Sequence, residues 1–501
     1  MYKLAGLDAG FLYSETPRAP QHIASVQVLE LPDGVNPTDF IADFKQLLVS
    51  RAHLVPYFTN KLQWVPFQLD HPEWVGDEAF DIDNHVLHAG GRTRRGRAES
   101  KAEIARTGTP PPGPAQAVVG NLGAHRAGRG RIAYYNRVHH ACLDGVSGQA
   151  AIEAIMDTTP EPRAVQPPPP EHTVRRRPGS LEMLAGAFQN LAGFQLRQAS
   201  RALEHVETAR RLWQRAVDPA KGLGAVTESA PPTRFNRAVE RQRSYATGEL
   251  PLGDLRSISK ATGTSLNDVF LAVCAGGLRS YLERRGELPG KSMIAGCPVS
   301  LRKPGDTASN NQVTMMMVSL ASNEADPVKR LLQIGRSAIQ GKGFVADVAG
   351  SYDADVALPG LPGLLSSAMQ MLESANLVDV DTPRLPCNIV VSNVPGPRQQ
   401  LYSLGAKVLT HYPVSIPAHS QGANITVQSY QGQMFFGITA CRRALPDPDV
   451  LRDDMLAAFV ALQERVLKTP AVLTPRQRAI DDNLPPLGVP APQHVRQSEA
   501  A

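Results

Sequence analysis

The sequence predicts a mixed α/β protein built from two domains, and three observations lead to this prediction. The chain has 501 residues, which is too long for one hydrophobic core and fits two domains of about 200 residues each. Strand-like and helical patterns alternate in both halves. Around residues 161–170 a proline-rich stretch interrupts them, because no helix or central strand tolerates that many prolines.

The first predicted domain covers residues 1–160 and mixes strands with helices. The segments His22–Leu31 and Arg131–Val138 read as strands, and Pro37–Arg51 has the apolar spacing of a helix. Short strands and helices within one domain are typical of a mixed α/β fold.

A linker with a helix inside it is predicted at residues 161–233. After the run Pro167–Pro170 and the triplet Arg175–Arg177, Ser180 is a suitable N-cap for a helix that continues, with breaks, to about Val217. This helix is basic and amphipathic, so it either lies on a membrane surface or packs its apolar stripe against a domain. We expect the second. The stripe consists of Leu181, Leu184, Phe188, Leu191 and Leu196.

The second predicted domain covers residues 234–467. Ser265 followed by Asp268 is a capping-box arrangement that opens a helix. The buried face predicted for this helix consists of Phe270, Val273, Cys274, Gly277, Leu278, Tyr281 and Leu282. Strands are predicted at Gln312–Leu320, Asn388–Asn393, Asn424–Tyr430 and Gln433–Thr439, the last two joined through Gln431-Gly432 as a hairpin. Residues 468–501 are polar and proline-rich, which is typical of a disordered tail.

The composition restricts the classes of function. The net charge of +5 is small for this length, so it permits contact with an anionic membrane surface and gives no reason to expect a nucleic-acid partner. Five scattered cysteines without a CxxC pair fit a reducing cytoplasm. We find no signal-peptide pattern and no apolar run of ~18 residues, so membrane contact is expected to be peripheral.

The segment from His139 to Gly145 has the pattern HHxxxDG and directly follows a predicted strand. The unperturbed pKa of histidine lies near neutrality, so this side chain can take a proton from an alcohol and pass it on. Asp144 is suited to fixing the loop by pairing, and Gly145 permits backbone geometry that other residues resist. Taken alone, the histidine pair fits a structural or weak metal-binding role equally well.

Further characteristic stretches lie along the chain, the first of them before HHxxxDG and the others after it. They are Leu7–Leu12 with Gln21-His22, Asn267–Ala272, Pro298–Arg302, Asn311–Val313, Ser392–Pro397 and Asn424–Val427. Together with HHxxxDG, they resemble the landmarks of the bacterial wax ester synthase/diacylglycerol acyltransferase family over residues 4–465. HHxxxDG alone is shared by carnitine, chloramphenicol and peptide-condensation acyltransferases, so the specificity of the resemblance comes from the combination.

The resemblance implies a CoA-dependent acyltransferase fold. Two similar α/β domains, each with a mixed β-sheet flanked by helices, would enclose an active-site channel between them. It also implies transfer of a long-chain acyl group from acyl-CoA to diacylglycerol, to a long-chain alcohol, or to both. Acyl-CoA is then a substrate, and no cofactor or metal is expected. The expected location is the cytoplasm, peripherally at the inner membrane face or at lipid droplets.

The same resemblance assigns roles to the motif residues. His140 would remove the proton from the acceptor hydroxyl as it attacks the thioester, and would then protonate the CoA thiolate. His139 would be its structural neighbour. Asp144 would hold the loop, with Arg302 as a partner, and Gly145 would complete the motif.

The remaining candidates lie in the second domain and would bind or support substrate. Asn267 either donates a hydrogen bond to substrate or to the developing oxyanion, or belongs only to the start of its helix. Asp268 is expected to be a cap. The turn Pro395-Gly396-Pro397, preceded by Ser392 and Asn393, is expected to be rigid and to lie beside the channel.

Residues 90–130 depart from the family pattern. The family carries a Leu-Asp-Arg-x-Arg-Pro-Leu-Trp-Glu box there, followed by an apolar strand, whereas this chain is rich in glycine, arginine and proline. The codons of Pro112–Arg126, read one nucleotide later, can encode that box and strand. We therefore hypothesise a compensated frameshift, which resequencing would settle. The segment as written is expected to be an irregular surface loop that leaves a gap in the first domain.

Two alternative functions stay open at this stage. A condensation-type acyltransferase would share HHxxxDG but would use carrier-protein thioesters, and the boxes at Asn267-Asp268 and Ser392–Pro397, with no carrier domain in the sequence, argue against it. A catalytically impaired lipid-binding homologue would fit the atypical segment 90–130 and the amphipathic helix.

Overall fold

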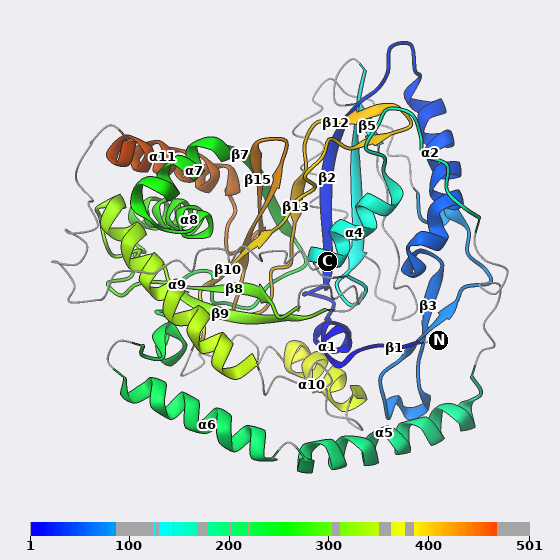
Figure 1. The fold of residues 1–501 in the computed structure, drawn as a ribbon, viewed down its shortest axis with the longest axis horizontal. Helices are drawn as coiled ribbons and strands as arrows, with labels where there is room; N and C mark the ends of the chain where they lie inside the picture. Colours follow the sequence, from blue (N-terminus) through cyan, green and yellow to red (C-terminus); the bar gives the residue numbers. More distant parts are fainter. Residues whose placement is uncertain are drawn as a thin grey trace, which may run out of the picture.

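Two six-stranded β-sheets with helices packed against them form the body of the protein (Figure 1). The structure is a computed structural model. It describes residues 2–86, 124–126, 130–143, 145–167, 178–200, 202–218, 221–302, 311–349, 362–375 and 385–467. The predicted tail at 468–501, and most of the atypical segment 90–130, lie outside these ranges.

The first sheet combines strands from both ends of the chain. Its order is β11–β12–β2–β6–β5, and β13 also pairs with β2. All described pairs are antiparallel, whereas the resemblance implied a mixed sheet. Helices α2 (Pro37–Arg51) and α4 (Gly145–Ile155) contribute to its core. The strands are β2 (His22–Glu30), β5 (Ala124–Arg126), β6 (Arg131–His139), β11 (Tyr402–Ser403), β12 (Ala406–Val408) and β13 (Tyr412–Val414).

The second sheet has the order β7–β15–β14–β10–β8–β9. It is mixed, because β10 runs parallel to both β8 and β14 while the other pairs are antiparallel. Four helices bury its main core: α7 (Leu252–Thr262), α8 (Leu266–Glu283), α9 (Pro327–Ala349) and α11 (Pro448–Leu467). The strands are β7 (Arg243–Pro251), β8 (Ile294–Ser300), β9 (Val313–Ser319), β10 (Ile389–Val394), β14 (Ala423–Tyr430) and β15 (Gln433–Cys441).

Strand β13 joins the two sheets. It pairs with β2, and its Pro413 carbonyl accepts a hydrogen bond from the Tyr245 hydroxyl of β7 at 3.0 Å. Gly437 of β15 lies so close that a Cβ atom there would be 1.9 Å from the Pro413 oxygen. Only glycine therefore permits this crossing.

Smaller elements surround the sheets. A three-stranded sheet is formed by β1 (Tyr2–Lys3), β4 (Glu73–Gly76) and β3 (Asn60–Gln63). Helices α1 (Gly6–Ser14) and α10 (Pro362–Ser374) pack against each other, and α5 (Ser180–Ser200) and α6 (Ala202–Val217) run end to end along the lower edge in Figure 1. The short 3-10 helices are η1 (Ala52–Leu54), η2 (Pro56–Phe58), η3 (Pro66–Gln68), η4 (Ile82–Asn84) and η6 (Gly224–Thr227).

Several sequence predictions are confirmed. Helix α2 has the predicted bounds, and α8 begins with the predicted capping box, in which Asp268 Oδ2 accepts from the Ser265 amide at 2.8 Å. The predicted face of α8 is buried, and β14 and β15 form the predicted hairpin. Gln431 and Gly432 both have positive φ, as a tight hairpin turn requires.

The prediction for the stripe on α5 was wrong. We expected Leu181, Phe188 and Leu196 to pack against a domain, yet they are exposed. The helix is held by its other side, where Met183 and Ala187 pack against Val65. Ser180 is the first residue of α5 and not a cap before it.

The domain boundaries stay a prediction. Within the range assigned to the second domain, residues 402–414 contribute strands β11, β12 and β13 to the first sheet. Among the described residues, no helix has both the length and the hydropathy required to span a membrane.

Candidate active site

A cavity of about 730 Å³ lies between the two sheets. Ile23 of β2, Val138 of β6 and Ile152 of α4 line it from the first-sheet side. Val390 of β10 and Gln428 of β14 line it from the second. The lining is mostly apolar with a few polar groups, which is the usual composition of a pocket for an organic ligand. The channel implied by the resemblance therefore has a counterpart in the fold.

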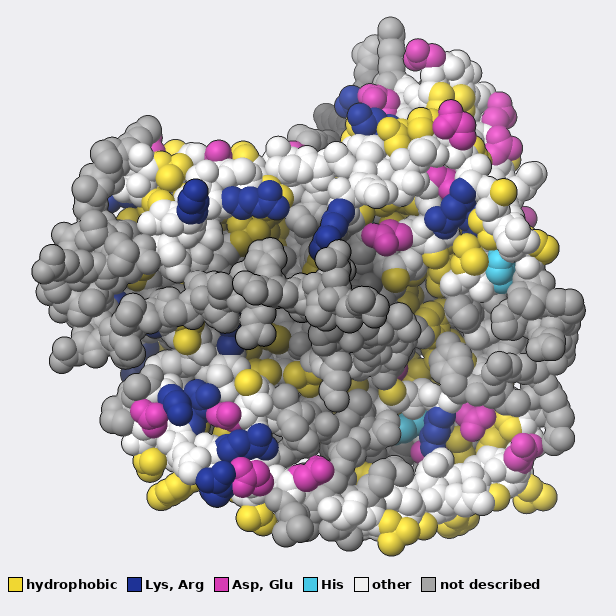
Figure 2. Space-filling view, viewed as in Figure 1, with side chains coloured by type: hydrophobic (Ala, Val, Ile, Leu, Met, Phe, Trp, Pro, Cys, Tyr) yellow, Lys and Arg dark blue, Asp and Glu magenta, His cyan; other side chains and the backbone are white. Residues whose placement is uncertain are grey.

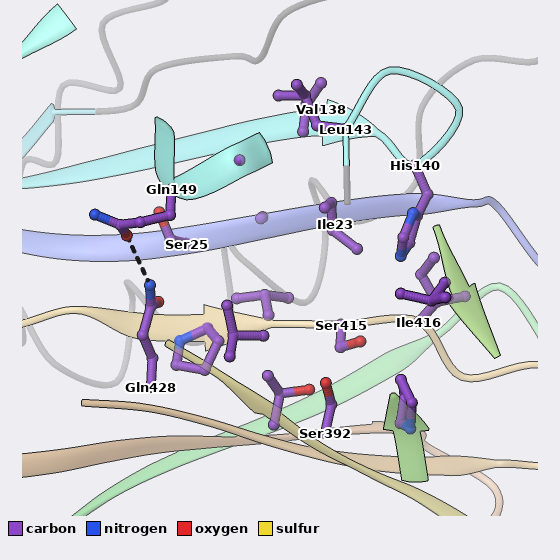
Figure 3. A pocket seen from close by; sticks show the side chains of 18 of the residues that line it. Ile23, Ser25, Val138, His140, Leu143, Gln149, Ser392, Ser415, Ile416 and Gln428 are labelled. Carbon is purple, nitrogen blue, oxygen red and sulfur yellow. Dashed lines mark hydrogen bonds between the residues drawn. The ribbon is translucent and has the colours of Figure 1, made fainter. Parts of the chain in front are cut away.

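His140 projects into this cavity from the loop that follows β6, facing Ile416 (Figure 3). Its ring stacks on Phe11 of α1, with ring centroids 4.0 Å apart and an interplanar angle of 7°. The His140 amide donates to the Gln21 carbonyl at 2.8 Å. Stacking and the backbone hydrogen bond together hold the imidazole in one orientation, as a proton-transferring group requires.

A buried clamp holds the loop of His140 from the second half of the chain. Asn311 donates through Nδ2 to the His140 carbonyl at 2.8 Å and to Asp8 Oδ1 at 2.5 Å. Its backbone amide also donates to Asp8 Oδ1, at 2.7 Å. Asn311 and Asp8 are almost fully buried, so these hydrogen bonds are shielded from water. The clamp joins α1, the loop that carries His140 and the residues that precede β9 at one point.

We predict that Asn311→Ala lowers kcat for acyl transfer about 10-fold to 10²-fold, because small displacements of a reacting group are costly. The KM for acyl-CoA should change little, since Asn311 does not line the cavity. The matched control is Asn36→Ala, which removes the exposed N-cap of α2 and should lower stability by about 1 kcal/mol at unchanged kcat. If both variants lose stability and keep kcat, the clamp does not position His140.

His139 is buried and points away from the cavity, toward Glu15 and His22. Its Nε2 lies 3.5 Å from Glu15 Oε2, and its Nδ1 accepts from the Ala141 amide at 3.1 Å. His22 Nδ1 lies 3.6 Å from Glu15 Oε1. Burial, together with the neighbouring His139 and Arg137, lowers the pKa of His22 to about 3. Burial alone would raise the pKa of Glu15, but the hydrogen bond from His139 and the nearby histidines hold it below its usual value.

These three side chains have the donor types of a metal site, and their ligand atoms lie within 4.8 Å of one another. The hydrogen bonds of His139 favour another explanation. Because Nδ1 accepts from an amide, the ring proton is on Nε2, the nitrogen that lies 3.5 Å from Glu15 Oε2. A metal-bound histidine normally donates a hydrogen bond through its second nitrogen, and here that nitrogen is an acceptor. The Ala141 amide therefore fixes the tautomer of His139, and His139 in turn supports the start of the loop that carries His140.

The structure describes Gly145 and Arg302 but not Asp144. Gly145 is the first residue of α4. Asp144 lies outside the described residues, so its pairing with Arg302 stays a prediction. Arg302 lies two residues after the end of β8, and its amide donates to Ser300 Oγ at 3.2 Å.

The candidates of the second half lie close to one another. Ser392, Asn393 and Pro395 line the cavity. Asn267 does not, but its Oδ1 accepts from Asn393 Nδ2 at 3.3 Å, so it is positioned to support Asn393. Asp268 caps α8, as expected. Gly396 packs against β14, where a Cβ atom would lie 1.7 Å from the Ser429 oxygen, so only glycine fits.

A hydrogen bond crosses the cavity away from His140. Gln428 Nε2 of β14 donates to Gln149 Oε1 of α4 at 3.1 Å (Figure 3). Gln428 belongs to the second sheet and Gln149 to a helix on the first-sheet side, so the pair closes one part of the space between the two sheets. Sequence analysis did not identify Phe11, Asp8, Asn311 or this pair as site residues, although the first three lie in stretches that carried the resemblance.

Comparison with known proteins decides the family. A model of the wax ester synthase/diacylglycerol acyltransferase catalytic domain matches residues 4–106 and 127–270, and a model of the WS/DGAT C-terminal domain matches residues 309–463. The chain belongs to the wax ester synthase/diacylglycerol acyltransferase family. The catalytic-domain match omits residues 107–126, which fall inside the atypical segment.

Relatives in this family align along most of the chain. The O-acyltransferase WSD of Acinetobacter baylyi is 31% identical over 464 residues, covering 89% of this chain and 93% of the relative. A Mycobacterium tuberculosis protein, provisionally named as a diacylglycerol O-acyltransferase, is 32% identical over 451 residues, covering 89% of this chain and 87% of the relative.

Solved structures support the same fold. The wax ester synthase/diacylglycerol acyltransferase of Marinobacter aquaeolei VT8 superposes with a TM-score of 0.65 at 25% identity, covering 93% of this chain and 100% of that chain. A starter condensation domain of rhizomide synthetase, in complex with C8-CoA and Leu-SNAC, superposes with a TM-score of 0.54 at 15% identity, covering 93% and 94%. This second likeness concerns the fold alone.

Proposed function

We propose that this chain is an O-acyltransferase that moves a long-chain acyl group from acyl-CoA to diacylglycerol, to a long-chain alcohol, or to both. The single observation that carries the proposal is the His140 imidazole, held in an apolar cavity of about 730 Å³ between the two sheets. That volume lies within the range of pockets for organic ligands. The names of the Acinetobacter and Marinobacter relatives support the reaction class.

In the proposed mechanism His140 is the general base. It accepts the proton of the acceptor hydroxyl as the oxygen attacks the thioester carbonyl. When the C–S bond breaks, the same imidazole returns that proton to the CoA thiolate. The products are one ester and free CoA, so the reaction needs no cofactor. The apolar walls would exclude water, which would otherwise compete with the acceptor and hydrolyse the thioester.

No acyl-enzyme is needed in this scheme. Cys142, inside the motif, is the nearest thiol in sequence to His140. It is buried, and burial raises its pKa well above the ordinary value, with nearby Asp8 adding to the effect. Such a thiol remains protonated and is a poor nucleophile. Attack on the thioester therefore falls to the acceptor oxygen.

The proposed acceptors are lipids, which supports a location at a lipid surface. We propose that the protein acts peripherally, at the inner membrane face or at lipid droplets.

The proposal is tested with purified protein and radiolabelled palmitoyl-CoA, offered with dioleoylglycerol in one reaction and hexadecanol in another. The expected result is labelled triacylglycerol or wax ester, formed together with free CoA thiol. Ester formed only from a carrier-protein thioester would indicate a condensation-type enzyme. Label that is bound but never esterified would indicate a lipid-binding homologue. Either outcome would overturn the proposal.

A further inference from the structure

Apolar side chains from three separate segments are exposed along one edge of the molecule. We call this surface the apolar edge. Its side chains are highly exposed, at 85% for Phe67, 82% for Leu181 and 72% for Leu196. Figure 2 shows hydrophobic side chains projecting along the lower edge, where Figure 1 places α5 and α6. The residues of the apolar edge are Phe67 of η3, Leu181, Phe188 and Leu196 of α5, and Met371 and Leu372 of α10.

The apolar edge is part of the folded body. Helices α5 and α10 both contact η3, so the three segments meet there. Asn190 of α5 donates to Asp70 Oδ2 at 2.9 Å, which fixes the middle of the helix. Phe67 has a φ of 59°, a left-handed conformation that costs a phenylalanine free energy. The fold thus holds an aromatic ring outward at a strained position.

An exposed apolar surface of this kind marks an interaction site. Its elongated form favours a lipid surface, because α5 and α6 lie end to end along the same edge. Helix α6 adds exposed Val206 and Trp213, and between them Arg210 pairs with Glu207 at 2.7 Å. Exposed apolar residues and tryptophan along surface helices are typical of helices that lie in the membrane interface.

The apolar edge also lies next to the cavity. Helix α10 packs against α1, and the Arg18 amide that follows α1 donates to Glu373 Oε1 of α10 at 3.0 Å. On its other side α1 lines the cavity with Leu7 and with Phe11, the ring that stacks on His140. One helix thus links the exposed apolar surface to the cavity that contains His140.

We propose that the apolar edge docks on a phospholipid bilayer, with α5 lying at the boundary between headgroups and acyl chains. This orientation turns the α1–α10 side of the cavity toward the lipid. The entry of a lipid acceptor from this side rests on the proposed function. The docking of the apolar edge on a bilayer does not depend on that function.

The test is flotation with vesicles of equal parts phosphatidylcholine and phosphatidylglycerol, without acyl-CoA. The double variant Phe188→Gln/Leu196→Gln should lower the bound fraction at least ~10-fold, because two large apolar side chains no longer enter the bilayer. The matched control is Val49→Gln/Val460→Gln, on α2 and α11, where both valines are 50% exposed. It should float like the wild type. Phe67→Gly should also weaken binding while keeping the thermal midpoint, because glycine accepts the positive φ.

Two results would overturn the docking proposal. In one, the edge variant floats like the wild type. In the other, the wild type does not float and the edge variant converts a dimer to a monomer in size-exclusion chromatography, which would make a second copy of the chain the partner. Ester formation from water-soluble decanoyl-CoA and a short alcohol in detergent is measured in parallel. If no ester forms but flotation depends on the edge, docking stands and the proposed function fails.

Discussion

His140→Ala is expected to lower kcat for ester formation by about 10²–10⁴-fold, the usual contribution of a positioned general base. The ring that stacks on Phe11 and faces the cavity would be missing, and no proton acceptor would replace it at that point. Affinity for acyl-CoA should change little, since the apolar walls of the cavity remain. Initial rates and acyl-CoA binding, measured on the same preparation, separate the two effects.

The matched control is His53→Ala, on η1 and outside the cavity lining. It should keep the wild-type rate. A His140→Ala protein that binds acyl-CoA and still forms ester at a rate close to the wild type would contradict the general-base role.

Arg51→Met should lower the free energy of unfolding by about 3–5 kcal/mol, because it leaves a buried carboxylate without its main partner. Arg51 and Asp157 have side-chain exposures of 1% and 2%, and they pair at 2.8 Å. Arg51 Nη1 also donates to the Ile155 carbonyl at the end of α4, at 2.7 Å. The residue thus ties α2 to α4, the helix that follows the loop carrying His140. Urea unfolding measures the change.

The same substitution at an exposed pair is the control. Arg131 pairs with Glu30 at 3.0 Å, with side chains 48% and 46% exposed, and such pairs contribute at most about 1 kcal/mol. If Arg51→Met and Arg131→Met lower the free energy of unfolding equally, the buried Arg51–Asp157 pair stabilises the fold no more than an exposed pair does.

Local sequence signals predicted the elements whose causes are local. The bounds of α2 follow from its apolar spacing, the start of α8 from the Ser265–Asp268 box, and the turn between β14 and β15 from Gln431-Gly432. HHxxxDG in its family context likewise singled out His140, which the structure places in the cavity. For α2, α8 and the hairpin turn, the residues that determine the feature are within a few positions of it, whereas His140 was singled out by a combination of stretches spread along the chain.

Features that depend on distant partners were not predicted. Asn311 meets Asp8 across 303 positions of sequence, and no pattern around either residue indicates the other. Strands β11–β13 join the first sheet because β2 offers them an edge, although their sequence lies among strands of the second. The stripe on α5 had helical spacing, but spacing alone does not say which side of a helix meets the protein.

The atypical segment 90–130 bears on the first sheet. Among its described residues, Ala124–Arg126 form β5, which pairs antiparallel with β6. The catalytic-domain model omits residues 107–126. The gap in the family match falls where the frameshift hypothesis expects altered sequence, and resequencing would test that hypothesis.

The central claim is that one cavity passes the acyl group directly from CoA to the acceptor hydroxyl. Initial velocities, with acyl-CoA and hexadecanol both varied, test it most directly. Direct transfer with both substrates bound predicts double-reciprocal lines that intersect. Parallel lines, together with an acylated protein detected by mass spectrometry in the absence of acceptor, would indicate a covalent intermediate and would contradict the claim.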